Sequence, residues 1–363
     1  MQRRHALSAA LCAGLALALA GPAAAQQPYY QGKTIRIIIP FSAGGGTDTF
    51  GRLVGQHLGR HIAGNPTVIA ENVTGAGGLL GTNEFAERAP KDGTVLLTAS
   101  GHLNLRAFLG LEGLRLNLKD VVPVAAAPMG HVTAINPQTS GVREAARLME
   151  MKGRITKGIT DPVGLVESIV ALEMFGIQYR PVPGFGGRGD TRLAFERGEL
   201  MINTQSTPAY LARVRPLVAE GKALPVYAIG FIDPQGRPVR DPAAPDIVTA
   251  PELYQQIHGR LPSGPAWEAY KVVANLVQNT RGTLWVHAAA PQAARDALRQ
   301  GVDKMVQDAE FKAAIAKTLE GYEMISGPGL DQIKRDLDAA PPEVLTWLRG
   351  MLGDKFGVKF EAR

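Results

Sequence analysis

Residues 37–50 read IIIPFSAGGGTDTF, and this stretch decides the fold. The branched apolar residues at its start continue a run over residues 34–40 that is typical of a strand buried on both faces. Three glycines, Gly44–Gly46, come next, and the apolar spacing of residues 48–62 predicts an amphipathic helix. Glycines let a ligand approach the backbone closely, and the first amides of a helix have no partners within it. The stretch therefore predicts an anion site where the helix begins.

The same unit of strand, glycine turn and helix recurs directly downstream. A strand is expected at residues 67–73, a glycine turn at 75–78 and a helix that ends near Arg88. A third strand is expected at residues 94–99. Such alternation predicts a parallel sheet whose loops gather at one edge, which is where ligands bind in sheets of this kind.

The second half of the chain repeats this alternation in interrupted form. Short strands are expected at residues 121–127, 132–135, 155–159, 179–182, 200–204 and 224–229, and helices at 143–151 and 162–175. Proline is frequent over residues 233–265, which indicates a connection between domains. Residues 291–349 have mostly the spacing of amphipathic helices.

The N-terminus predicts export. Arg3–Arg4 precede an apolar run at residues 6–20, and Ala23–Ala25 form a cleavage site of the A-x-A kind. We therefore expect residues 1–25 to be a signal peptide that is cleaved near Ala25, and the mature protein to act in the periplasm. The sequence leaves Sec and Tat export open. The one cysteine, Cys12, lies in this signal, so the mature chain is expected to depend on its core and not on disulfides.

Length and charge narrow the classes of function. Removing 25 residues and two arginines leaves 338 residues with a formal charge of +4. At roughly 150 residues per domain, this length predicts two domains. The small basic excess favours an anionic small molecule, whereas the lack of a clustered basic run argues against nucleic acid as a partner.

The common nucleotide and catalytic motifs are incomplete in this chain. A P-loop needs a lysine after its last glycine, where Thr47 and Asp48 stand, and the Rossmann pattern fails because Gly81 comes one position late. The chain has neither a G-x-S-x-G elbow nor an H-E-x-x-H motif. His57 and His61 lie four residues apart on one predicted helix, but we expect two solvated side chains there. No cofactor, metal or catalytic residue is therefore expected.

The motifs of the first hundred residues resemble a known family. The segments IIIPFSAGGGTD at residues 37–48, VIAEN at 68–72, GAGGLLG at 75–81 and APKDGT at 89–94 follow one another in a specific order. This order is similar to that of the Bug-type (TctC-like) solute receptors of tripartite tricarboxylate transporters. Beyond residue 100 the similarity is thinner.

The resemblance implies a fold, a function and partners. The fold would be α/β, a two-lobed periplasmic binding protein (type II-like) with a central mixed sheet in each lobe and a ligand cleft between the lobes. Lobe 1 would comprise residues 26–121 with 232–363, and lobe 2 residues 122–231. The protein would be a monomer that closes around a small organic carboxylate without chemical turnover. It would deliver this ligand to the membrane permease subunits of such a transporter.

The resemblance also implies a ligand site built from one loop of each lobe. Backbone amides and ordered waters would hold the carboxylate, with the first loop at residues 41–48 and the second near residues 156–161. Asp48 would orient a water or accept a bond from the ligand, and Lys157 and Arg188 are weaker candidates for the distal charge of a diacid. The expected set is Phe41, Ser42, Ala43, Gly44, Gly45, Thr47, Asp48, Ser100, Lys157, Gly158, Thr160, Asp161, Phe185, Arg188, Asn203 and Gln205.

Two other hypotheses stay open. Gly184–Phe185 stand where the family usually has a Tyr-Lys pair, so the ligand is not named from the resemblance. In one alternative, the receptor serves a sensor kinase instead of a permease. In the other, the protein is an exported hydrolase or isomerase that uses Asp48 with Asp161 or Asp190. The missing arrangement of nucleophile and base counts against that enzyme.

Overall fold

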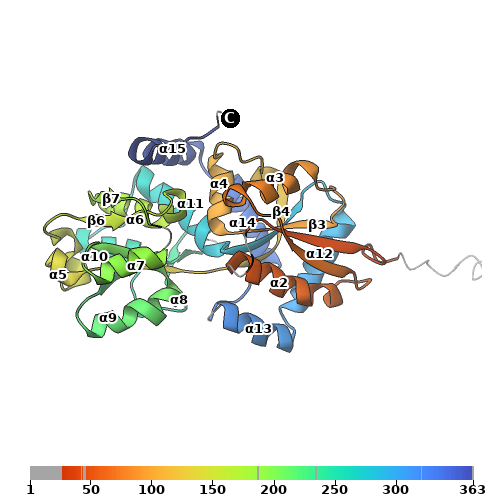
Figure 1. Cartoon of the computed structure of the whole chain (residues 1–363), viewed down its shortest axis with the longest axis horizontal. Helices are drawn as coiled ribbons and strands as arrows, with labels where there is room; N and C mark the ends of the chain where they lie inside the picture. Colours follow the sequence, from red (N-terminus) through yellow and green to blue (C-terminus); the bar gives the residue numbers. More distant parts are fainter. Residues whose placement is uncertain are drawn as a thin grey trace, which may run out of the picture.

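The protein consists of two lobes side by side, each built around a five-stranded sheet (Figure 1). The computed structural model describes residues 27–41, 43, 46–185, 188–233, 235–319 and 321–361. The signal-peptide prediction concerns residues 1–25 and so lies outside the described residues. None of the helices in the described part of the chain is both long and apolar enough to cross a bilayer.

The sheet of the first lobe is mixed, with the strand order β2-β1-β3-β12-β4. Its strands are β1 (Thr34–Ile39), β2 (Thr67–Asn72), β3 (Val95–Ala99), β4 (Val121–Ala127) and β12 (Gly282–His287). β1 runs parallel to β2 and β3, as the alternating pattern predicted. β12 returns from the distant C-terminal half and lies antiparallel between β3 and β4. Residues far apart in the chain therefore meet at this sheet.

The second lobe repeats the design. Its sheet has the order β7-β6-β8-β5-β9. The strands are β5 (His131–Ile135), β6 (Thr156–Gly158), β7 (Arg180–Val182), β8 (Ile202–Ser206) and β9 (Leu224–Ala228). β6 runs parallel to β7 and β8, whereas β5 lies antiparallel to β8 and β9. The expectation of an α/β fold with a mixed sheet in each lobe is therefore confirmed.

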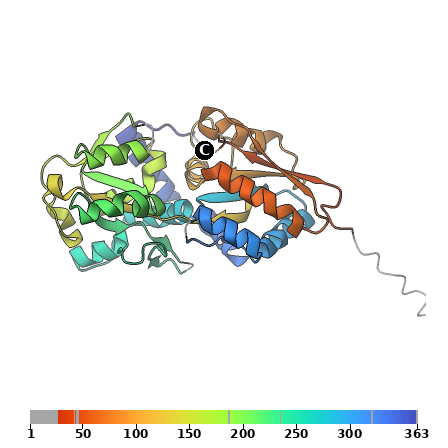
Figure 2. The same cartoon turned by 60° about the horizontal axis from the view of Figure 1, so that its bottom comes forward.

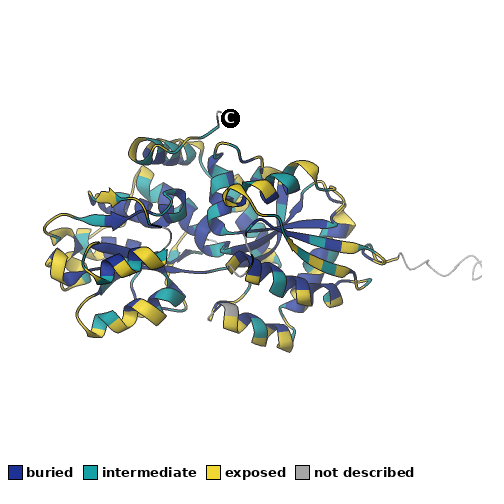
Figure 3. Cartoon of the chain, in the orientation of Figure 1, coloured by how far each residue is buried: buried dark blue, intermediate teal, exposed yellow. Residues whose placement is uncertain are grey.

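Helices cover both faces of the first sheet because its strands are apolar on both sides. Ile37 packs with α2 (Gly46–Leu58) and α12 (Gln292–Met305), whereas its neighbour Ile38 packs with α3 (Leu79–Arg88) and α4 (Gly101–Leu109) on the opposite face. The central strands are buried in both lobes, as Figure 3 shows. The other helices here are α13 (Ala309–Leu319) and α14 (Pro328–Asp338). Figure 2 shows α2 and α13 side by side.

The second lobe has its own helices, and two further helices, α11 (Pro265–Asn279) and α15 (Pro342–Phe356), connect it with the first lobe. The second lobe contains α5 (Pro137–Ser140), α6 (Val166–Phe175), α7 (Arg188–Glu196), α8 (Thr207–Ala209), α9 (Arg215–Ala219) and α10 (Ala250–His258). α11 packs against both α6 and α4. α15 returns to the second lobe, where Lys355 lies 2.5 Å from Glu173. The predicted helix over residues 143–151 is instead a six-residue 3-10 turn, Ala145–Glu150.

Two segments of the chain pack with a different lobe from the one expected. Residues 122–127 were expected in lobe 2, but they belong to β4 and pair with β12 in the first sheet. Residues 232–281, expected in lobe 1, include α10 and α11, whose apolar faces join the core of the second lobe. We propose that the chain crosses from the first lobe to the second at residues 128–130 and back at 280–281, before α15 returns to the second lobe.

The first crossing is braced by a buried polar cluster. The Gly130 amide donates to the Tyr322 hydroxyl at 2.9 Å, and this hydroxyl lies 2.7 Å from the Asp241 carboxylate. The Thr207 hydroxyl donates to the same carboxylate at 2.5 Å, and Asp241 is fully buried. A Cβ atom at Gly130 would lie 1.8 Å from Asp241 Oδ2, so only glycine fits at this crossing.

Candidate functional site

The first glycine loop leads into α2 at the junction of the lobes. Ser42, Gly44 and Gly45 of the expected site lie outside the described residues. Phe41 packs on the neighbouring glycine turn, where a Cβ at Gly78 would lie 2.9 Å from the Phe41 ring. Gly78 has a φ of 97°, which favours glycine. The remaining members are the exposed Ala43 and the buried Thr47, which is in the first turn of α2.

Asp48 braces this loop from inside. Its Oδ1 accepts from Arg52 Nε at 2.9 Å and from Asn72 Nδ2 at 2.8 Å. Asn72, the last residue of β2, also donates to the Phe41 carbonyl at 2.9 Å. One oxygen of Asp48 is therefore already bound by two donors that link β2, α2 and the loop. The role of Asp48 as a direct ligand contact stays a prediction.

Arg281 is the functional candidate that the sequence reasoning missed. It lies at the second crossing, directly before β12, and its guanidinium lies beside the start of α2. A Cβ at Gly46 would be 2.8 Å from Arg281 Nη2. Its Nε lies 3.2 Å from the Met129 sulfur, and among the described residues no carboxylate pairs with it. Burial and the charge of Arg188 lower the pKa of Arg281.

A small cavity opens beside this guanidinium. Its volume is about 40 Å³, which is room for a few water-sized groups, because one water needs roughly 10–15 Å³ by the same measure. The lining residues come from α2, from both crossings and from the end of α13; they are Gly46, Phe50, Ala127, Met129, Arg281, Gly282 and Leu319. A cation and a helix N-terminus thus face a space that fits a single small anionic group.

Arg188 of the second lobe is paired already. It lies 2.5 Å from Glu167, donates to the Gly164 carbonyl at 2.8 Å and to the Thr204 carbonyl at 3.3 Å. The Glu167 side chain is completely buried, and its other oxygen lies 3.3 Å from His102 Nε2 on α4. Burial alone would raise the pKa of Glu167, but Arg188 and His102 hold it well below its usual range.

Lys157 lies inside the second lobe. It is 2 % exposed, and its Nζ lies 3.4 Å from the Thr204 hydroxyl. Burial, reinforced by the charge of Arg188, lowers the pKa of Lys157 to about 7. The adjacent Gly158 is packed tightly, because a Cβ there would lie 3.1 Å from the Phe185 ring. Lys157 and Arg188 both lie beside Thr204, but Lys157 is sealed from solvent, and its contact with a ligand stays a prediction.

The other predicted residues have structural partners. Asp161 accepts from the Val163 and Gly164 amides at 3.3 and 3.1 Å, and it forms an ion pair with Arg106 of α4. Asp161 therefore caps the helical turn that begins at Val163. Ser100 caps α4 by accepting from the Leu103 amide at 3.2 Å.

Two residues of β8 hold the start of α7. Gln205 Nε2 donates to the Arg188 carbonyl at 2.8 Å and to Asn203 Oδ1 at 3.0 Å, and Asn203 Nδ2 donates to the Thr191 hydroxyl at 3.3 Å. Asn203 and Gln205 share one face of the strand because they are two positions apart. Thr160 is partly buried beside Asp161. The structure thus brings Lys157, Asn203 and Gln205 together near Arg188.

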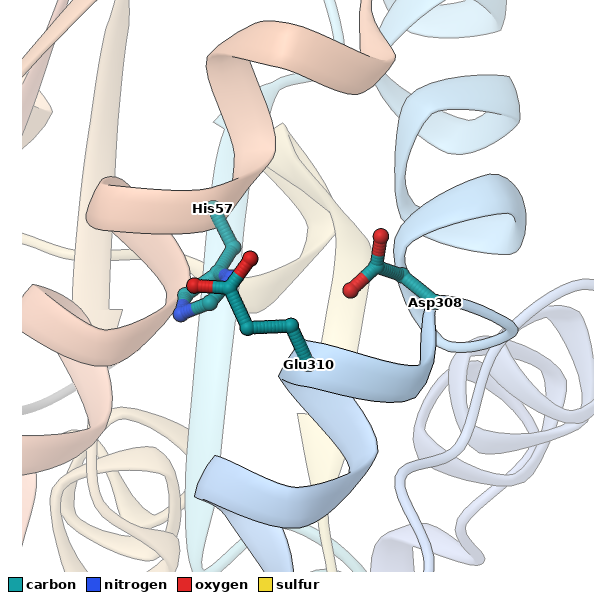
Figure 4. A group of neighbouring side chains, drawn as sticks. All are labelled: His57, Asp308 and Glu310. Carbon is teal, nitrogen blue, oxygen red and sulfur yellow. The ribbon is translucent and has the colours of Figure 1, made fainter.

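A separate cluster joins α2 to α13, and it buries His57, which was expected to be solvated. His57, Asp308 and Glu310 converge there, as Figure 4 shows, with donor atoms within 4.8 Å of one another. One nitrogen of Arg60 lies 3.0 Å from His57 Nδ1, 3.2 Å from Asp308 and 2.8 Å from Glu310. The guanidinium therefore already supplies the cation at the centre of this cluster, which acts as a bridge between the two helices.

Sequence comparison places the chain beside proteins of the UPF0065 group. It is 28 % identical over 258 residues to the UPF0065 protein in the gbd 5′ region of Cupriavidus necator, covering 68 % of this chain and 74 % of that protein. It is 36 % identical over 115 residues to Protein BugT of Bordetella pertussis, covering 31 % of this chain and 34 % of BugT. No family model matches the chain.

Solved structures share the fold. A TctC solute-binding protein from Polaromonas, with no ligand, aligns with a TM-score of 0.64 at 18 % identity, covering 90 % of this chain and 99 % of that one. MatC from Rhodopseudomonas palustris with bound malate aligns with a TM-score of 0.55 at 19 % identity, covering 86 % and 99 %. A second R. palustris protein, with adipate, aligns with a TM-score of 0.55 at 16 % identity, and the alignment covers 90 % of this chain and 98 % of that one. The predicted resemblance to the Bug-type, TctC-like solute-binding proteins is thus confirmed in sequence and in fold.

Proposed function

We propose that the protein is a periplasmic solute-binding protein that captures a small organic carboxylate between its lobes and delivers it to a tripartite tricarboxylate transporter. The observation that carries this proposal is Arg281, whose guanidinium lies at the N-terminus of α2 beside a small cavity and has no described carboxylate partner. The solved neighbours with malate and adipate support the same ligand class.

The physical argument rests on complementary charge. The first amides of α2 and the Arg281 guanidinium are both donors, and each favours a negatively charged acceptor. Arg281 is partly withdrawn from water and has no described counter-ion, so a carboxylate that fills the cavity would gain strong hydrogen bonds. The lobes would close over the ligand. The pairs Arg106–Asp161 and His102–Glu167 connect α4 with the second lobe and would hold the two lobes together.

The proposed partners follow from this role. The protein would act as a monomer after cleavage near Ala25, and membrane permease subunits would receive the ligand. A sensor kinase as the receiving partner stays an alternative. The hydrolase alternative is weakened, since Asp48 is engaged by Arg52 and Asn72, and Asp161 caps a helix. No chemical turnover is therefore proposed.

Thermal unfolding against a panel of acids tests the proposal. The mature protein would be melted with mono-, di- and tricarboxylates, aromatic acids, acidic amino acids and the matched amides. A ligand present at about a thousand times its dissociation constant should add roughly 4 kcal/mol to the free energy of unfolding. Stabilisation by one class of acids and not by its amides is expected. A panel in which no acid raises the melting temperature would contradict the proposal.

A further inference from the structure

The charges at the lobe junction are nearly all compensated. Three arginines near it each have a described carboxylate partner: Arg188 lies 2.5 Å from Glu167, Arg52 lies 2.9 Å from Asp48, and Arg106 pairs with Asp161. The described residues around the α2 cavity therefore present one arginine without a carboxylate partner, Arg281.

The buried Lys157 cannot reach a ligand that is bound beside Arg281. Lys157 is 2 % exposed, and its nearest described partner is the Thr204 hydroxyl inside the second lobe. His131 is also buried, and its Nδ1 lies 2.8 Å from Gln278 Oε1, so its ring already has a polar partner within the protein. Neither side chain offers a second positive group to a molecule bound beside Arg281.

We infer that the site selects acids with a single carboxylate over dicarboxylates, and that the Glu167–Arg188 pair determines this selectivity. This inference rests on the proposed function and deepens it. One carboxylate would be held by Arg281 and the start of α2. A second carboxylate would have to enter a partly buried junction in which Glu167 already occupies Arg188, so it would find no free cation there. The rest of the ligand is therefore neutral.

Matched pairs of acids test the selectivity directly. The probes are succinate and succinamate, glutarate and glutaramate, adipate and adipamate, and terephthalate and its monoamide. Each pair has nearly the same shape but differs by one charge. Titration calorimetry is performed at about pH 8, above the ordinary titration range of imidazole. We expect the wild type to bind the monoamide of the best pair at least about tenfold more tightly than the diacid.

A substitution should abolish this preference. Glu167→Gln removes the negative partner of Arg188 and so frees a second guanidinium for the ligand. We expect the ratio of diacid to monoamide affinity to rise at least about tenfold in this variant. Glu173→Gln, on the same helix but paired with Lys355 away from the junction, is the matched control and should leave the ratio unchanged. The melting temperature of each variant verifies that it is folded.

The outcomes separate the two proposals. A wild type that binds the diacid more tightly than its monoamide overturns the selectivity and leaves the carboxylate receptor intact. An unchanged ratio in folded Glu167→Gln overturns the role of the Glu167–Arg188 pair. If Glu167→Gln does not fold, the wild-type ratio alone decides the selectivity. If no acid or monoamide binds, and no acid of the wider panel stabilises the protein, the proposed function itself has failed and the selectivity fails with it.

Discussion

At the scale of single residues, the site depends on which charges have partners. Arg281 has a sulfur neighbour and no described carboxylate, Arg188 is neutralised by Glu167, and Lys157 has only a hydroxyl. A buried charge without a counter-ion destabilises the fold, and proteins tolerate it mainly where a ligand or a shifted pKa compensates. The three side chains therefore have different roles although all are basic.

Lys157 makes a testable contribution to the pH dependence of stability. The pKa of Lys157 is lowered to about 7 in the folded protein by burial and by Arg188, and it returns to its ordinary value, about 10.4, on unfolding. The unfolded chain therefore binds more protons between these values, so stability rises with pH in that window by up to about 1.4 kcal/mol per unit. Lys157→Met should be more stable than wild type near neutral pH and should lose this rise.

Chemical denaturation of both proteins from about pH 6 to pH 10 measures this contribution. The difference between the two curves isolates Lys157 from the other titrating groups. Parallel curves across the whole range would mean that Lys157 stays charged in the folded protein.

At the scale of elements, β2 and α2 are joined by a polar network that fixes the first loop. Asn72 donates both to Asp48 and to the Phe41 carbonyl. Asn72→Ala leaves Asp48 and Arg52 with one partner fewer, and we expect it to lower the free energy of unfolding by about 1–3 kcal/mol. Because the loop loses its anchor, acid affinity should fall as well. Urea denaturation and titration calorimetry measure the two effects.

Thr67→Ala, at an exposed position of the same strand, is the control and should change stability by less than about 0.5 kcal/mol. A normal acid affinity in Asn72→Ala would show that the network supports the fold and not the loop.

The elements also show how far sequence reasoning reaches. Local patterns identified nearly every strand of both sheets, since a branched apolar run such as residues 34–40 specifies a buried strand by itself. The glycine loop and helix start on which the proposed anion site depends could be expected for the same reason. The role of Arg281 could not be expected, because Arg281 reaches α2 only when β12 inserts between β3 and β4. That insertion pairs segments that lie almost two hundred residues apart in the chain. The apolar run after Arg281 was the one available signal.

At the scale of the whole molecule, α4 connects the two lobes through polar side chains. Arg106 pairs with Asp161, and His102 lies 3.3 Å from Glu167. Arg106→Gln should weaken acid binding by about three- to tenfold, because a partly exposed pair contributes on the order of 1 kcal/mol. Preference for acid over amide should be unchanged, since Arg106 does not line the α2 cavity. Titration calorimetry with one acid and its amide distinguishes the two effects. Loss of the preference itself would place Arg106 in direct contact with the ligand.

The most direct measurement is the affinity of Arg281→Gln for the acid that stabilises the wild type most. Glutamine keeps a hydrogen-bond donor but removes the charge, so the ligand-free variant should be folded and at least as stable as the wild type. The account predicts that acid affinity falls at least about tenfold while the amide is affected little. An affinity for the acid that equals that of the wild type would contradict the claim that Arg281 holds the carboxylate.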